Sequence, residues 1–215
     1  MELSETPRTR ITRLPDRGRT ERADLYAVLD AGLVCHLGLV RDGSPVVIPT
    51  GYGRIGDTLY LHGSSGSGWA RQVVGQPVCV TVTHLDAIVY ARSVFDHSMN
   101  YRSVVVFGLV RRVDDADEKW AGLAAVSEQL APGSWDYVRQ PSKRELAATV
   151  VLAVELSEAS VKVRTGPPSD DPADLDSGLW AGIVPVRTVL GAPIAAPDVA
   201  PDLTVPPHIG LRRLS

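Results

Sequence analysis

Alternating apolar and polar residues dominate the first two thirds of the chain, with turn residues between the runs. This pattern predicts short strands at residues 33–40, 45–53, 58–63, 77–83, 87–94, 101–113, 150–163 and 181–190. Asp-Gly at positions 42–43 is a strong hairpin signal, and a second tight turn is expected at residues 54–57. Connections this short join antiparallel neighbours, so the strands are predicted to form an antiparallel meander.

Two segments have helical spacing instead. Thr20–Ala31 is predicted to be a helix that Thr20 caps, with Leu25, Val28 and Leu29 on one face. Asp117–Leu130 is the longer helix, and its predicted apolar face holds Trp120, Leu123, Val126 and Leu130. Shorter helical turns are expected at residues 69–74 and 142–146. Gly108, inside the longest strand, predicts a bulge or a sharp bend.

These elements predict a mainly β (α+β) fold, an antiparallel barrel of six to eight strands with peripheral helices. Residues 1–20 carry prolines and many charges and are interpreted as an extended arm. Residues 21–190 form the domain, and residues 191–215 a proline-rich tail.

Composition narrows the function classes. The 215 residues are 44% hydrophobic and carry a net charge of −3, which argues against non-specific nucleic-acid binding. A polar N-terminus and the lack of a long apolar run predict no signal peptide and no membrane span, hence a cytoplasmic protein. Cys35 and Cys79 lie in apolar stretches and are interpreted as reduced core residues. No spacing of cysteines or histidines indicates a bound metal.

Basic residues gather at two places. Six arginines lie between residues 8 and 22. They form either a solvated arm or, for one or two of them, a contact with a phosphate or a partner subunit. Lys162 and Arg164 are two apart on a predicted strand and therefore share a face, which is either solvated or a site of doubled positive charge.

A glycine- and serine-rich loop carries the clearest candidate chemistry. It runs from Gly63 to Gly68 between a strand and a helix start. Glycines let a ligand approach the backbone, and Ser64, Ser65 and Ser67 add hydroxyl donors, so the loop is a candidate phosphate site. The alternative is a plain serine-capped turn. No Walker lysine and no nucleophile elbow is present, and no catalytic residue is assigned.

Several stretches of the chain together resemble the flavin-nucleotide-binding branch of the pyridoxamine 5'-phosphate oxidase-like superfamily, which includes the nitroimidazole-resistance reductases. The resemblance spans about residues 8–190. It rests on the stretches PVVIPTGYG, LYLHGSSGS, PVCVTVTHLDAIVYARSVFDHSMNYRSVVVFG, ASVKVRTGPPSDD and LWAGIVPV.

The resemblance implies a split barrel that dimerises and holds FMN between the subunits. The residues implied for the cofactor are the strand Val47, Ile48, Pro49 and Thr50, the loop His62, Gly63, Ser64, Ser65 and Ser67, the strand Tyr101, Arg102 and Ser103, and Trp180 reaching from the other subunit. One position departs from the family, because relatives carry Lys or Arg where this chain has Gly68. Arg71 and Arg102 are the candidates to supply the missing cation.

Two functions are compatible with these residues. The first is an FMN-dependent oxidoreductase acting on a small planar or conjugated substrate, in which the flavin carries the chemistry. The alternative is a non-catalytic flavin- or haem-binding module for storage, sensing or delivery, with His62, His84 or His97 as an axial haem ligand. In both cases a homodimer is expected, with no nucleic acid and no membrane as partner.

Overall fold

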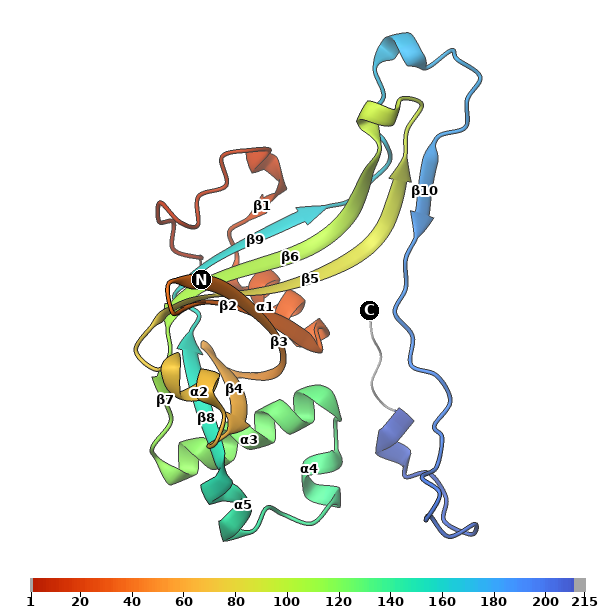
Figure 1. Cartoon of the computed structure of the whole chain (residues 1–215). Helices are drawn as coiled ribbons and strands as arrows, with labels where there is room; N and C mark the ends of the chain where they lie inside the picture. The colour runs from red at the N-terminus through yellow and green to blue at the C-terminus, as the bar shows by residue number, and fades with distance from the viewer. Residues whose placement is uncertain (1, 211–215) are drawn as a thin grey trace.

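The computed structural model describes residues 2–210, and an antiparallel sheet dominates it (Figure 1). The ten strands are β1 (Gly18–Arg19), β2 (Val34–Arg41), β3 (Ser44–Ile55), β4 (Thr58–Ser64), β5 (Pro77–Tyr90), β6 (Ser98–Leu109), β7 (Arg111–Arg112), β8 (Thr149–Glu155), β9 (Glu158–Arg164) and β10 (Gly182–Pro185). Their order in the sheet is β1-β9-β6-β5-β2-β3-β4-β8-β7, and β10 pairs with β5.

The α-helices are α1 (Arg22–Ala31), α2 (Gly68–Gln72), α3 (Ala116–Leu130), α4 (Ser134–Tyr137) and α5 (Lys143–Ala148). Single 3₁₀ turns are η1 (Pro15–Arg17), η2 (Val94–Asp96), η3 (Pro172–Asp174) and η4 (Pro207–Gly210). None of the helices in the described part of the chain is long and apolar enough to cross a membrane.

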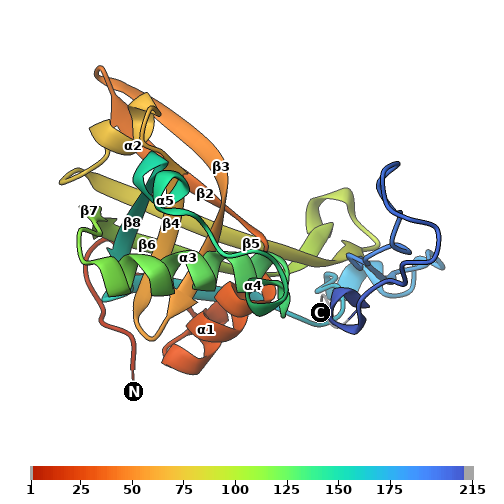
Figure 2. The same cartoon turned by 90° about the horizontal axis from the view of Figure 1, so that it is seen from below.

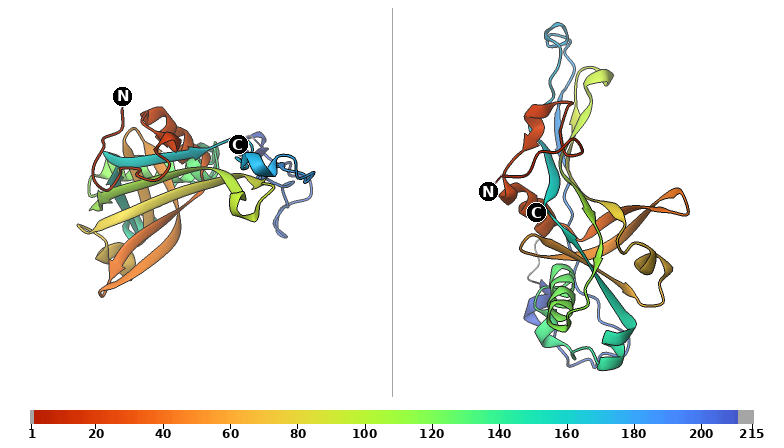
Figure 3. Two further views of the ribbon diagram at one scale, coloured as in Figure 1. Left: turned by 90° about the horizontal axis from the view of Figure 1, so that it is seen from above. Right: turned by 90° about the vertical axis from the view of Figure 1, so that its left-hand side faces the viewer.

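The mainly β prediction is confirmed, but the predicted strand number of six to eight is wrong. The run 150–163 is two strands, because the chain turns at Leu156–Ser157. The runs 77–83 and 87–94 are largely one strand, because a register shift between Leu85 and Ala87 absorbs the interruption. Among residues 2–210 the path of paired strands ends at β1 and β7, so the curved sheet is not a closed barrel (Figure 3).

Local sequence explains the hairpins and helices. Asp42 and Gly43 both have positive φ, 51° and 76°, as a two-residue type I′ turn between β2 and β3 requires. In α1 the predicted face of Leu25, Val28 and Leu29 is buried, but Glu21 and not Thr20 is the N-cap, because the helix starts at Arg22.

Helix α3 packs on β3, β4 and β8, and Figure 2 shows it running across the strands. Val126 is buried there, whereas Leu130 is 62% exposed, so the predicted face of α3 is only partly a core face. The close approach depends on Gly53 of β3, where an added Cβ would lie 2.4 Å from the carbonyl carbon of Ala125.

The sheet's concave side holds the main core. Buried side chains from α1, α2 and seven strands meet there, among them Leu29, Leu37, Leu61, Val73, Val80, Val106 and Val154. Gly108 lies in this region without the predicted bulge, since it pairs regularly with Val78. Packing explains the glycine, because a Cβ there would come within 2.8 Å of Cγ1 of Val154.

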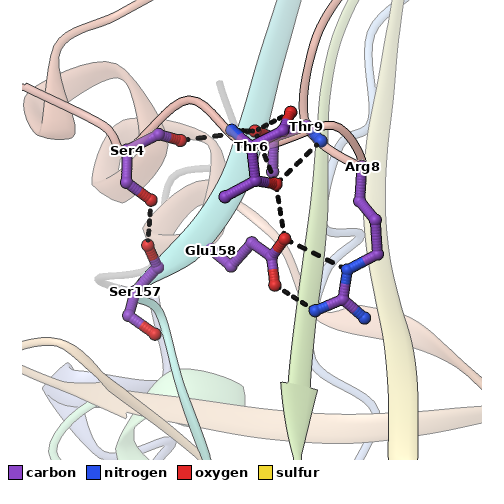
Figure 4. A network of polar contacts seen from close by, with 6 residues as sticks. All are labelled: Ser4, Thr6, Arg8, Thr9, Ser157 and Glu158. Carbon is purple, nitrogen blue, oxygen red and sulfur yellow. Dashed lines mark hydrogen bonds and ion pairs between the residues drawn. The ribbon is translucent and has the colours of Figure 1, made fainter.

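The N-terminal arm is fastened to the turn between β8 and β9. Glu158 accepts hydrogen bonds from Thr6 and Arg8, and Ser4 Oγ donates to the carbonyl of Ser157 over 2.6 Å (Figure 4). The arm continues into β1, which pairs with β9. Arg8, one of the six arginines predicted either to be solvated or to contact a phosphate or a partner, therefore forms an ion pair with Glu158.

Beyond the core, β5 and β6 continue as a long hairpin that projects from the rest of the sheet, and β10 pairs with the projecting part of β5 (Figure 1). We call this three-stranded extension, residues 85–100 with 175–185, the projecting arm. After β10 the chain returns toward the helices, where His208 packs on Tyr137 with ring centroids 4.7 Å apart. Residues 186–206 thus connect the projecting arm to the helices at the other end of the fold (Figure 1).

Candidate functional site

Strand β3 changes partner along its length, and this opens a split in the sheet. Residues 44–51 pair with β2, whereas residues 52–55 pair with β4. The β3–β4 ladder stops at the pair Tyr52–Leu61, and the two strands separate from there. Among residues 2–210, no strand pairs with the other edge of residues 44–51, so an open strand edge faces the split.

The open edge contains the strand predicted to meet the flavin. Pro45 and Pro49 lack a backbone N–H, and proline is tolerated in sheets mainly at such edges. Val47 is 64% exposed and Ile48 packs against the core, as alternation along a strand requires. The N–H and carbonyl of Val47 face the same open edge as the two prolines, whereas those of Thr50 point toward β2.

The glycine- and serine-rich loop leaves the sheet on the opposite side of this split. It follows His62 and Gly63 of β4, which are the next residues after the last β3–β4 pair. The N–H of Ser65 donates to the carbonyl of Ala148 over 2.8 Å, and the N–H of Ser67 donates to the carbonyl of Ser64 over 2.9 Å. The structure thus brings two predicted segments, residues 47–50 and 62–67, to the two sides of one opening.

Two glycines in this loop have different roles. At Gly63 a Cβ would lie 3.2 Å from the ring of Trp69, so the small residue lets α2 pack against β4. At Gly68, the position where the resemblance implies a cation, a Cβ would meet nothing within 4 Å. Arg71 lies one turn further along α2 and is exposed. Position 68 therefore has room for a basic side chain, and Arg71 is the basic residue that α2 carries instead.

Register places a set of side chains on the convex side of the sheet, opposite the core. We call it the outer face, and cross-strand pairs define it as Val47, Pro49, His36, Gly38, Cys79, Thr81, Val105 and Phe107. Its members are mostly apolar or hydroxyl-bearing, and Val47 and His36 are exposed. Such a face can bind a planar apolar ligand or the surface of a second protein.

The three residues predicted on β6 do not point the same way. Tyr101 and Ser103 lie on the outer face, and Ser103 Oγ donates to the carbonyl of Lys162 over 3.3 Å. Arg102 lies on the opposite face and forms an ion pair with Asp86 at 2.8 Å. Hydrogen bonding to Asp86 raises the pKa of Arg102. A phosphate at Arg102 would have to compete with this carboxylate.

The histidines differ in what they can bind. His84 Nε2 lies 3.0 Å from the carbonyl oxygen of Val28, and His97 Nδ1 accepts the N–H of Ala91 over 3.1 Å. His62 instead lines a cavity of about 280 Å³ between β4 and the helices, together with Leu123 and Trp135. Its ring is therefore on the helix side of the sheet, and among residues 2–210 that ring has no hydrogen-bond partner.

Trp180 lies on the projecting arm, just before β10, and is 68% exposed. Its ring centroid is 6.1 Å from that of Tyr90. Several other large apolar side chains of the arm are exposed, namely Leu85, Val94, Phe95, Met99, Leu179 and Ile183. The arm contributes no residue to either core cluster within the described residues, so its own fold does not cover these side chains.

The two cysteines lie on opposite faces of the sheet. Cys35 is fully buried in the core, as predicted, and burial raises the pKa of its thiol to about 12. Cys79 is only half-buried and belongs to the outer face, so its assignment to the core is wrong. Both are free thiols. In the part of the chain that the structure describes, no cluster of three metal-ligating side chains is present.

A family model described as pyridoxamine 5'-phosphate oxidase matches residues 21–163. No curated protein sequence matches the chain. Among solved structures, the flavocytochrome Anf3 from Azotobacter vinelandii is 36% identical and has a TM-score of 0.92, with 98% of each chain covered.

Two further structures are similar. The FAD and heme binding protein from Mycobacterium smegmatis is 41% identical, with a TM-score of 0.86, 90% of this chain covered and 95% of that one. A putative 5-nitroimidazole antibiotic resistance protein from Bacteroides thetaiotaomicron is 22% identical and has a TM-score of 0.58, covering 68% of this chain and 86% of its own. At that identity the last match supports the fold alone.

Proposed function

Because this chain belongs to the pyridoxamine 5'-phosphate oxidase family, we propose that it is a flavin-dependent redox protein whose flavin lies against the open edge of β3. The observation that carries this proposal is the unpaired edge of residues 44–51 beside the loop of Gly63–Gly68. When bound, a flavin supplies the hydride or electron transfer, and the protein supplies binding, orientation and electrostatics.

The residues present fit the two ends of such a cofactor. The polar rim of the flavin ring needs both donors and acceptors, and the unpaired strand edge supplies the N–H of Val47 together with the carbonyls of Pro45, Val47 and Pro49. The phosphate end needs donors in a shallow loop, and Ser65 and Ser67 supply their hydroxyl groups there, since their N–H groups already donate to the carbonyls of Ala148 and Ser64. The outer face then leaves one side of the ring open to a small planar substrate.

Which flavin is bound is a separate question. The family resemblance implies FMN, whereas the 41% identical Mycobacterium smegmatis protein is named for FAD and heme. Purified protein titrated with riboflavin, FMN and FAD separately should develop a bound-flavin absorption spectrum at micromolar concentration with at least one nucleotide. Failure of all three to bind in this range would contradict the proposed function.

The position of Gly68 gives a sharper prediction. Gly68→Lys should tighten the binding of FMN or FAD by about tenfold, because it restores a cation near the phosphate, and charge-assisted contacts contribute ~1.5–3 kcal/mol. The open space at Gly68 accepts the side chain. Gln76→Lys adds the same charge at an exposed position beyond the end of the helix and is the control, expected to change the dissociation constant less than twofold. Equal effects of the two variants would place the phosphate elsewhere.

We further propose that two copies of the chain associate and share the site. The outer face and the projecting arm both present apolar side chains to solvent, and large exposed apolar surfaces mark interaction sites. A second subunit covering them would also shield the flavin. Trp180 on the arm is then positioned to reach the partner's site.

A second candidate function is that of a flavin and haem protein, since the relatives at 36% and 41% identity are named as a flavocytochrome and as an FAD and heme binding protein. Of the histidines considered as ligands, His62 has the free ring and an apolar cavity that Leu123, Trp135 and Leu146 line. Arg139 lines the same cavity but already forms an ion pair with Glu145 at 2.8 Å, so a haem propionate would have to compete with that carboxylate.

Haem titration tests this candidate. The purified protein should develop a Soret band with one equivalent of haem, and His62→Ala should remove most of that band. His36→Ala, which removes another exposed strand histidine, is the control and should leave it intact. A Soret band that survives His62→Ala would assign the iron to another residue, and no band at all would exclude this function.

A further inference from the structure

A cavity of about 340 Å³ lies between the N-terminal arm and the end of β9, on the opposite edge of the sheet from the open edge of β3. Three arginines line this cavity, namely Arg17 and Arg19 from the N-terminal arm and Arg164 from β9. The remaining lining residues are Asp16, Val163, Thr165, Pro167, Pro168 and Ser169. The cavity therefore combines residues from two segments that the sequence separates by more than a hundred positions.

Arg164 is unusual because it is buried without a carboxylate partner. Its side chain belongs to a residue only 7% exposed. It donates to Asn100 Oδ1, to the carbonyl of Gly166 over 3.4 Å and to the carbonyl of Pro167 over 3.2 Å. All three acceptors are neutral, and among residues 2–210 Arg164 has no ion pair. A buried charge of this kind is costly unless an opposite charge comes near.

The neighbouring arginines increase that cost. Burial and, next, the positive charge of Arg17 lower the pKa of Arg164, so the two guanidinium groups are close enough to repel. Arg19 donates to the backbone carbonyls of Asp16 and Gly18, which are also neutral. Asp16 is the acidic residue among those that line the cavity, and three cations with one anion leave a net charge of about +2.

We propose that this arginine cavity binds a phosphate group of a nucleotide. A terminal phosphate, or the two linked phosphates of a dinucleotide taken together, carries close to two negative charges at neutral pH, which matches the excess charge, and planar guanidinium groups bind phosphate oxygens in pairs. The hydroxyls of Thr165 and Ser169 add neutral donors at the rim. The proposal does not require the flavin site, since it depends on the charges of the N-terminal arm and of β9.

The phosphate could belong to one of two nucleotides. Arg164 lies opposite Tyr101 on the outer face, and β9 is four strands from β3, roughly 19 Å at ~4.8 Å per strand. One source is therefore a dinucleotide cofactor that lies across the sheet from the open edge. The other source is a second nucleotide, such as an electron donor, that binds beside the cofactor.

Calorimetric titration with inorganic pyrophosphate at low ionic strength tests the cavity. The unmodified protein should bind it saturably, and Arg17→Gln should weaken binding at least tenfold. The side chain of Arg17 makes no hydrogen bond or ion pair within residues 2–210, so its replacement should leave the fold intact. Arg13→Gln removes the same charge from the same arm outside the cavity and should change the affinity less than twofold. Absence of saturable binding, or equal effects of the two variants, would overturn the proposal.

Flavin titrations of the same variants then distinguish the sources. If the phosphate is part of the cofactor, Arg17→Gln should weaken FAD binding and leave riboflavin binding unchanged. If it belongs to a second nucleotide, FAD affinity stays the same, and the flavin-loaded protein binds pyrophosphate as the flavin-free protein does. Equal loss of riboflavin and FAD affinity would contradict a phosphate site. Pyrophosphate binding without any flavin binding would reject the proposed flavin site and keep this one.

Discussion

Substituting alanine for Gly53 is expected to lower the free energy of unfolding by about 3 kcal/mol, the upper part of the range for overpacked cores. The added methyl group would lie 2.4 Å from the carbonyl carbon of Ala125 and 2.5 Å from the nitrogen of Val126. Both atoms belong to the backbone of α3, which cannot turn aside as a side chain could. The helix must therefore move away from β3 and lose contacts with Tyr60 and Val151.

Gly51 offers a matched control for this substitution. It is two residues earlier on β3 and therefore on the same face of the strand, but a Cβ there would meet nothing within 4 Å. Urea unfolding of the cofactor-free protein should show a large loss for Gly53→Ala and a change below about 1 kcal/mol for Gly51→Ala. Equal losses would mean that α3 does not pack against β3 as described.

Replacing Phe95 with aspartate is expected to convert the proposed dimer to monomers. Phe95 is 94% exposed at the tip of the projecting arm, next to the similarly exposed Val94. In an assembly that covers the arm, this ring would be a central apolar anchor. A charge in its place removes that burial and adds a desolvation cost, so the dimer dissociation constant should rise roughly 100-fold or more.

Sedimentation over a range of protein concentrations measures this change. Ile55→Asp, at the turn between β3 and β4, adds the same charge at another exposed apolar residue and should leave the dimer intact. A monomeric unmodified protein would contradict the shared site directly. A dimer that persists in Phe95→Asp would place the interface away from the arm.

Sequence pattern predicts the strands where turn residues separate them. The β2–β3 hairpin is predictable from Asp42 and Gly43, which have the backbone angles that the turn demands. The turn between β8 and β9 escapes prediction because Leu156 and Ser157 carry no comparable signal, so two strands read as one. The short strand β1 forms only where the chain meets β9, and no local pattern indicates it, whereas β7 lies inside the predicted run 101–113, which the structure divides at Val110.

The candidate site is predictable in its segments and less so in its contacts. The family resemblance implies that residues 47–50 and the loop after His62 contact one cofactor, and the structure puts both segments beside one split, while the cofactor contact itself stays a prediction. The Asp86 partner of Arg102 is not predictable, because Asp86 lies in the register shift of β5, a feature that alternation does not reveal. Arg164 is buried because the N-terminal arm lies beside β9, and the sequence pattern does not predict this contact either.

The opposite placement of the two cysteines makes the native chain convenient for labelling. A thiol-specific fluorophore or spin label needs an accessible thiolate, and the Cys35 thiol offers neither access nor easy deprotonation. Cys79 sits next to Gly38 and Phe107, in the middle of the convex surface where the cofactor and partner are proposed to bind. Burial raises the pKa of the Cys79 thiol too, but Cys79 is the more exposed of the two cysteines, so labelling at raised pH should select it and report on occupancy of that surface without any engineered residue.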